Sequence, residues 1–297
     1  MRRRLLIVGG LTLALAACDT APSGPDDGIV IVATTSVLGD IVQFVAGDEA
    51  RLEILIPIGV DAHDFSPSAQ QASVISGADL VVANGLGLEA GLGDFITAAA
   101  ADGVEVLEVA PLLDPIPLRS DETTLDPHFW MDPLRAGEAA REIAEALAAR
   151  TEGGWEERAG AYALQLEATD VTVSELLSVI PAPGRIMVTN HESLGYFADR
   201  YEFEILGVVV PGGSTLAEPS SAHLAELVEI MDEAGANVVF AETTEPATLA
   251  EAITSELGAD ARVVELYTES LGEPGSEAGT LSGMLLSNAR SISEALA

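Results

Sequence analysis

The feature that most constrains the fold is a twofold alternation of short β-rich runs with helical patterns. The first four runs cover residues 29–33, 51–57, 79–83 and 104–109, and the second four cover 185–189, 203–210, 237–241 and 262–266. Helical periodicity fills the intervals and returns over 280–296. Strands that alternate with helices indicate a mostly parallel sheet covered by helices. We therefore expect an α/β protein of two lobes, each with a four-stranded sheet.

One long helix is predicted between the two halves. After Gly153 and Gly154, one helix face is maintained by Trp155, Ala159, Tyr162, Leu166, Thr169, Val173, Leu176 and Ile180. This face runs for about 27 residues, or about 40 Å at the usual rise, and Pro181 ends it. We expect a rigid linker helix within 153–182, joining an N-terminal lobe (29–152) to a C-terminal lobe (183–297).

Two shorter helices have recognisable starts. Asp132 followed by Pro133 fits an N-cap and a first helical residue, and Ser66 followed by Pro67 fits the same pattern. The sequence therefore predicts that helices begin at Pro133 and at Pro67.

The first 17 residues are typical of an export signal. Three arginines precede the apolar stretch LLIVGGLTLALAA, which is too short to span a bilayer comfortably. Leu15, Ala16, Ala17 and Cys18 resemble the lipobox of bacterial lipoproteins. We expect a signal peptide at 1–17, an acylated Cys18 and a flexible tether over 18–28. The alternatives are a plain signal peptide or an uncleaved anchor.

The composition limits the classes of partner. The chain has 48 Asp and Glu against 13 basic residues, all of them Arg, for a formal net charge of −35. Loss of the three arginines in 1–17 would give 10 − 48 = −38. So acidic a chain is not expected to bind nucleic acid, and it suits a cation-rich medium or reflects a general acidic bias of its source. A single cysteine excludes an internal disulfide.

Three of the four histidines follow predicted strands. His63 comes after the run ending at 57, His128 after the run ending at 109, and His191 two residues after the run ending at 189. Glu269 follows the last run by three residues. Ligands of parallel sheets bind beyond the carboxyl ends of the strands, so these four side chains are expected to face one cleft. Three imidazoles and one carboxylate suit a divalent transition metal. His223, early in a helical pattern, is expected to be structural.

Four ordered segments resemble the zinc/manganese solute-binding proteins of bacterial ABC importers. They are VDAHDFSPS, DPHFWMDP, VTNHESLGYFADRYEFEILG and LYTESLGEPG, and the likeness extends from about Ile29 to the C-terminus. The resemblance implies two α/β lobes joined by one long helix. It also implies a metal shell of His63, His128, His191 and Glu269. Within DPHFWMDP, Phe129 and Trp130 are expected to shield the ion from water.

The resemblance implies an exported, lipid-anchored or periplasmic protein of the cell envelope. Its expected role is to capture Zn²⁺, with Mn²⁺ as the alternative, and to deliver the ion to an ABC permease with its cytoplasmic ATPase. We expect a monomer without enzymatic activity. His191 favours zinc, because manganese-selective relatives tend to have a carboxylate at that position.

Two departures from the family pattern affect the expected site. Many zinc members carry a histidine-rich loop before the second ligand, but the corresponding stretch DPIPLRSDETTL (114–125) contains no histidine. A loop-assisted capture mechanism is therefore in doubt. The late acidic ligand is often Asp, and the longer Glu269 stands here instead.

Two other classes of function remain open at this stage. A zinc-dependent hydrolase would need an open coordination position and a base, for which Glu192, Glu242 or Asp64 is available. No H-E-x-x-H helix is present, and four protein ligands would close the shell. The second class is an adhesin, which the acidic composition does not specifically support.

Overall fold

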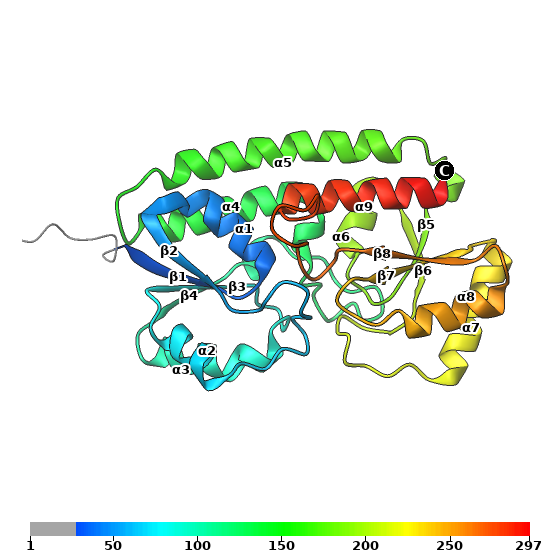
Figure 1. The fold of residues 1–297 in the computed structure, drawn as a ribbon, viewed down its shortest axis with the longest axis horizontal. Helices are drawn as coiled ribbons and strands as arrows, with labels where there is room; N and C mark the ends of the chain where they lie inside the picture. Colours follow the sequence, from blue (N-terminus) through cyan, green and yellow to red (C-terminus); the bar gives the residue numbers. More distant parts are fainter. Residues whose placement is uncertain (1–27) are drawn as a thin grey trace, which may run out of the picture.

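The computed structural model describes residues 28–297 as two α/β lobes that lie side by side (Figure 1). The predicted signal peptide, Cys18 and all but the last residue of the tether lie outside the described residues. Each lobe holds one four-stranded sheet, and every strand pair in it is parallel. The predicted fold class is confirmed, with fully rather than mostly parallel sheets.

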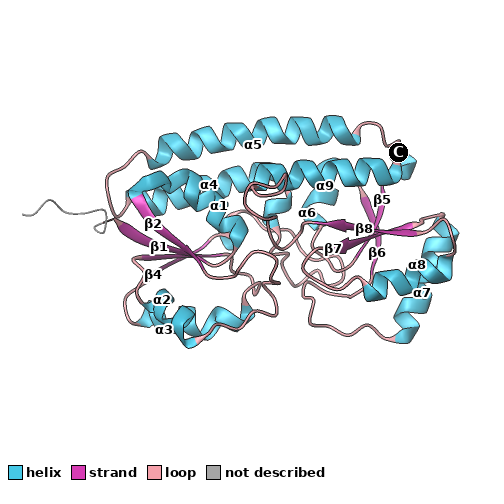
Figure 2. Ribbon diagram, in the orientation of Figure 1, coloured by secondary structure: helices cyan, strands magenta, loops and turns pink. Residues whose placement is uncertain are grey.

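The N-terminal sheet has the strand order β2-β1-β3-β4. Its strands are β1 (Ile29–Ala33), β2 (Ala50–Ile54), β3 (Leu80–Ala83) and β4 (Glu105–Glu108). Its helices are α1 (Ser36–Ala46), α2 (Ala69–Ser76), α3 (Gly93–Ala101) and α4 (Pro133–Ala148). Helices α1 and α4 cover one face of the sheet, and α2 and α3 cover the other (Figure 2). The central strand β3 is buried throughout, as expected for a strand covered on both faces.

The C-terminal sheet repeats this topology in the order β6-β5-β7-β8. Its strands are β5 (Ile186–Thr189), β6 (Glu204–Val208), β7 (Val238–Glu242) and β8 (Arg262–Leu266). The helices that follow residue 190 are α6 (Gly195–Tyr201), α7 (Ser221–Ala234), α8 (Thr248–Leu257) and α9 (Leu281–Leu296). The two sheets have corresponding strand orders. In each sheet, the carboxyl ends of the two central strands therefore lead into loops on the same edge of the sheet, where parallel sheets bind their ligands.

Helix α5 (Trp155–Leu177) connects the lobes and packs against α1, α4 and α9. It has 23 residues, so it is shorter than the sequence pattern predicted, and a turn at 178–180 follows it. Its length is therefore about 35 Å at the usual rise. The buried face also differs at its end, where Leu177 is buried and Leu176 only partly so. The last turn of the pattern does not form because the chain unwinds before Pro181.

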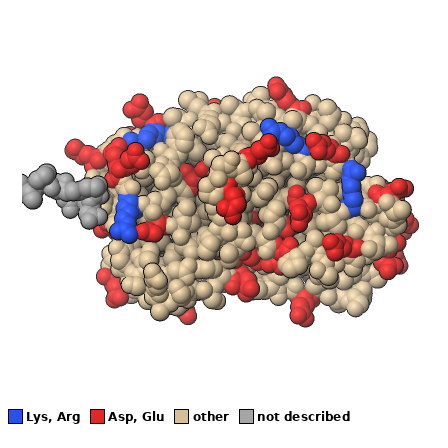
Figure 3. All heavy atoms as spheres, in the orientation of Figure 1, with Lys and Arg blue, Asp and Glu red and all other residues tan. Residues whose placement is uncertain are grey.

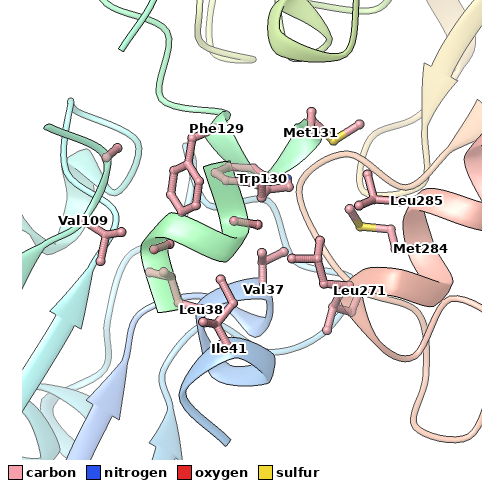
Figure 4. Packing of buried hydrophobic residues seen from close by; sticks show 14 of the residues in the cluster. Val37, Leu38, Ile41, Val109, Phe129, Trp130, Met131, Leu271, Met284 and Leu285 are labelled. Carbon is pink, nitrogen blue, oxygen red and sulfur yellow. The ribbon is translucent and has the colours of Figure 1, made fainter. Parts of the chain in front are cut away.

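Apolar side chains from both lobes form one continuous cluster beneath the loops that join them. Figure 4 shows Phe129, Trp130 and Met131, which form a short 3₁₀ turn, above Val37 of α1 and to the upper left of Met284 of α9. Burial of such a cluster stabilises the lobe arrangement, and it is a reason to expect only small relative movement of the lobes.

Hydrogen bonds to one carboxylate join the helices α1, α5 and α9. The hydroxyl of Tyr162 in α5 donates to Asp40 of α1 at 2.7 Å, and the Leu281 amide at the start of α9 donates to the same carboxylate at 3.2 Å. Burial raises the pKa of Asp40, although both hydrogen bonds oppose that rise. These hydrogen bonds therefore fix α9 and α5 to the N-terminal lobe.

One of the two predicted helix starts is confirmed and the other is wrong. Asp132 caps α4, and its carboxylate accepts the Leu134 amide hydrogen at 2.9 Å. Helix α2 begins at Ala69 rather than Pro67, with Ser68 as its N-cap. Ser68 has Gln71 three residues later and forms a complete capping box, which Ser66 cannot form because Ala69 occupies that position.

Candidate metal centre

The structure brings together the four residues that the sequence singled out. One ligand atom from each of His63, His128, His191 and Glu269 lies within 4.8 Å of all the others. All four residues are buried, and His128 and His191 are fully so. His63 and His128 come from the N-terminal lobe, and His191 and Glu269 come from the C-terminal lobe, so the group lies where the lobes meet.

Each ligand candidate lies on a loop beyond a strand end. His63 follows β2, His191 follows β5 by two residues, and Glu269 follows β8 by three. His128 ends the long segment after β4 and is the N-cap of the 3₁₀ turn Phe129–Met131. These placements agree with the predicted cleft at the carboxyl edges of two parallel sheets.

The spacing of the nitrogen and oxygen atoms suits a small four-coordinate cation. The Nε2 atom of His128 lies 3.4 Å from Nε2 of His63 and 3.4 Å from Nε2 of His191. Carboxylate oxygens of Glu269 lie 3.2 Å from His128, 3.5 Å from His191 and 3.8 Å from His63, measured to Nε2. A tetrahedral shell with ligands ~2.0–2.1 Å from the metal spaces them ~3.3–3.4 Å apart.

Two of the histidines are oriented by carboxylates behind them. Nδ1 of His128 donates to Asp126 at 2.7 Å, and Nδ1 of His191 lies 2.6 Å from the Glu242 carboxylate in an ion-pair contact. A hydrogen on Nδ1 leaves the lone pair on Nε2, which points into the group of four. Carboxylate–histidine pairs of this kind fix the ring orientation and raise its basicity toward a metal.

The charges of the group shift its pKa values strongly. Burial opposes protonation of His128, but Glu269 and Asp126 outweigh it and raise the pKa of His128 to about 10. Burial likewise opposes protonation of His191, and Glu242 with Glu269 raises its pKa. Burial dominates at His63 and lowers its pKa. The pKa of Glu269 falls to about 2, because the surrounding histidines outweigh its burial.

The carboxylate of Glu269 faces only imidazoles. Among residues 28–297, no backbone amide or hydroxyl group donates a hydrogen bond to either of its oxygens. A buried carboxylate without such donors is costly unless a cation compensates its charge. The arrangement can therefore hold a divalent cation, which three neutral imidazoles and this carboxylate would surround.

Acidic side chains surround the one ligand that retains contact with solvent. His63 is 5% exposed, Asp61 lies beside it, and Glu245 of the other lobe lies near Asp61. Burial raises the pKa of Glu245, and so do Asp61, Glu242 and Asp64. A cation that approaches from this side meets a negative potential.

The aromatic residues next to His128 are buried beside it. Both Phe129 and Trp130 are buried, and the Trp130 ring centroid lies 5.4 Å from that of His128. The indole of Trp130 donates to the Thr268 carbonyl at 2.7 Å, beside Glu269. His223 lies outside the group of four, in the first turn of α7, with its Nε2 atom 2.9 Å from the Val208 carbonyl.

Sequence reasoning missed the carboxylates that orient the imidazoles. Asp126 precedes His128 by two residues, and its carboxylate also accepts the His128 amide hydrogen at 2.9 Å, so the DPH spacing carried a usable signal. Glu242 is the last residue of β7, which lies beside β5, and this strand-end position could have indicated it. From the sequence alone, Glu242 stands out only as a candidate catalytic base.

The comparisons with known proteins agree on one family. Residues 31–295 match the family described as zinc-uptake complex component A, periplasmic (ZnuA). The chain is 30% identical to the zinc-binding protein TroA of Treponema pallidum, over 97% of this chain and 94% of that protein. It is 28% identical to the manganese-binding lipoprotein MntA of Halalkalibacterium halodurans, over 96% and 94% of the two chains. The solved structure of Treponema pallidum TroA superposes with a TM-score of 0.84 at 28% identity, covering 91% of this chain and 99% of that one.

Proposed function

The chain belongs to the family of the periplasmic zinc-uptake component ZnuA, and from this we propose that it captures a divalent transition metal outside the cytoplasm. It then delivers the ion to an ABC permease with its cytoplasmic ATPase. His63, His128, His191 and Glu269 hold the metal between the lobes. The observation that carries the proposal is the buried Glu269 carboxylate, which faces three Nε2 atoms at 3.2–3.8 Å.

Zinc is the proposed ion, and manganese is the alternative. The four-ligand shell contains three nitrogens, and its Nε2 and carboxylate atoms lie close enough together to surround one small ion, both of which suit zinc. Zinc also lies well above manganese in its intrinsic affinity for nitrogen-rich sites. Names of the relatives include both metals, with zinc for TroA and manganese for MntA. Selectivity must therefore come from this chain's own residues.

The site is proposed to bind metal without catalysing a reaction. A hydrolytic zinc site needs a free base next to an open metal position. Glu242 is engaged by His191 and by the Ser193 hydroxyl, which donates at 2.8 Å. Glu192 accepts the amide hydrogens of Arg119 and Ser120 at 2.8 and 3.1 Å. Asp64, the third acid considered, is exposed outside the buried group.

The proposed location is the cell envelope, with the protein lipid-anchored to the outer face of the cytoplasmic membrane or periplasmic. Relatives are named as lipoproteins, and none of the described helices combines the length and apolar character that a membrane crossing requires. Acidic side chains are spread over the face shown in Figure 3, which does not favour nucleic-acid partners. Replacing Cys18 by Ser should abolish lipid labelling and release the protein from membranes.

The proposed organisation of the chain follows the sequence boundaries. It comprises a signal peptide (1–17), a lipidated tether (18–28), two lobes (29–152 and 183–297) and the linker segment 153–182. A monomer is proposed, because all four ligand candidates come from one chain.

Metal loading of the purified mature protein tests the function. We expect that, after chelation and exposure to equal zinc and manganese, elemental analysis finds one zinc ion per chain and little manganese. The quadruple His63→Ala, His128→Ala, His191→Ala, Glu269→Ala variant should bind neither. If it retains stoichiometric metal, the assigned site is wrong, and if the wild type loads manganese instead, the zinc assignment is wrong.

A further inference from the structure

His63 differs from the other two histidines in how it is held. The carboxylates of Asp126 and Glu242 lie 2.7 and 2.6 Å from Nδ1 of His128 and His191, but no described residue makes such a contact with Nδ1 of His63. His63 is instead fixed through its backbone, whose amide hydrogen is accepted by Asp61 Oδ1 at 2.9 Å. Its position therefore depends on the loop that carries it.

That loop is tied to the opposite lobe at two points. The second oxygen of Asp61, Oδ2, accepts a hydrogen bond from the hydroxyl of Thr215, which lies in the segment between β6 and α7. The amide of Gly59 donates to the hydroxyl of Ser270 at 2.9 Å, beside Glu269. Asp61 thus connects the backbone of an N-terminal-lobe ligand to a side chain of the C-terminal lobe.

We propose that Thr215 and Asp61 are positioning residues that hold His63 on the metal and thereby set how long the ion stays bound. This inference rests on the metal-binding function proposed above. Departure of the ion toward solvent requires the most exposed ligand to move, and the Thr215–Asp61 contact restrains that ligand across the lobes. A permease that separates Thr215 from Asp61 would loosen His63 without disturbing His128 or His191.

The chemistry of the contact predicts the size of its effect. The acceptor is a carboxylate, 6% exposed, and hydrogen bonds to charged groups are stronger than those between neutral groups. Loss of the Thr215 hydroxyl should raise the metal dissociation rate about tenfold. The association rate should change far less, because interface changes act mainly on dissociation.

Three threonine variants test the role of the hydroxyl. Thr215→Val removes it at nearly constant shape, and Thr215→Ser keeps it. Thr172→Val is the matched control, because Thr172 is exposed on α5 and its hydroxyl donates only to the Ala168 carbonyl. Zinc dissociation is followed by stopped flow with an excess of a chromophoric chelator. We expect about tenfold faster release from Thr215→Val, and rates near wild type for the other two.

Further measurements separate positioning from a general loss of structure. Apo-protein melting temperatures should agree for wild type and Thr215→Val, and the ligand-field spectrum of the cobalt-loaded proteins should retain its four-coordinate bands. Asp61→Ala should also speed release, and the double variant should be no faster than Asp61→Ala alone. Additive effects, or a Thr215→Val rate within twofold of Thr172→Val, would overturn the proposal. If the wild type itself binds no zinc, the proposed function fails instead.

Discussion

The charge of Glu242 should matter to metal binding although Glu242 does not reach the metal position. The Glu242 carboxylate lies 2.6 Å from His191 Nδ1 and accepts a hydrogen bond from the Ser193 hydroxyl. In Glu242→Gln the side chain keeps its size and an oxygen acceptor but loses its negative charge. Changes to such partners of metal-binding histidines cost 10–100-fold in affinity. We therefore expect zinc affinity to fall by about 1.4–2.7 kcal/mol.

The pH dependence of this loss identifies its cause. Burial opposes protonation of His191, but Glu242, followed by Glu269, raises its pKa, so a proton competes with zinc for the wild-type imidazole at neutral pH. Without the Glu242 charge the pKa of His191 is lower, so protons compete less with zinc for its imidazole. The deficit of Glu242→Gln should consequently be largest near pH 8 and shrink toward pH 6.

Chelator competition at fixed ionic strength across this pH range is the assay, with Glu192→Gln as the control. Glu192 is also buried and is adjacent to His191, but its carboxylate accepts backbone amides and contacts no imidazole. If both variants lose the same zinc affinity, the effect comes from a general disturbance of the loop and not from the charge beside His191. A Glu242→Gln affinity within twofold of wild type would refute the reasoning.

Further outcomes are expected from the site. A hundredfold excess of zinc over Kd should stabilise the wild type by about 2.7 kcal/mol in thermal unfolding, and His63→Ala, His128→Ala and His191→Ala should lose most of this gain while His223→Ala keeps it. Because the apo pKa of His128 is about 10, zinc must displace its proton at pH 7; affinity should weaken as pH falls, and calorimetry in buffers of different ionisation enthalpy should detect at least about one proton released. His191→Glu should narrow the zinc-over-manganese affinity ratio in competitive titration, since manganese gains more from carboxylate oxygens. Apo and zinc-bound forms should have similar radii of gyration in solution scattering, because α5 and the shared apolar cluster hold the lobes together.

Strand alternation was sufficient to predict the two parallel sheets, and strand ends indicated three of the four residues that the structure brings together. His191 and Glu269 follow β5 and β8 so closely that the strand boundaries nearly determine their location. His128 lies far from β4, and its assignment depended on the DPHFWMDP motif. The predicted end of α5 lies about one turn too far along the chain. The apolar spacing continues through Leu176 and Ile180, although the helix ends at Leu177 and the chain unwinds before Pro181.

The residues that were missed depend on contacts that periodicity does not encode. Glu242 reaches His191 because β7 lies beside β5, which is a property of strand order rather than of either strand's sequence. Thr215 reaches Asp61 from the other lobe, and that contact depends on how α5 and the shared apolar cluster hold the lobes together. His128 and His191 are thus oriented within single lobes, whereas His63 is oriented across the two. If these residues hold the metal as proposed, a small change between the lobes would act on His63 first and could release the ion.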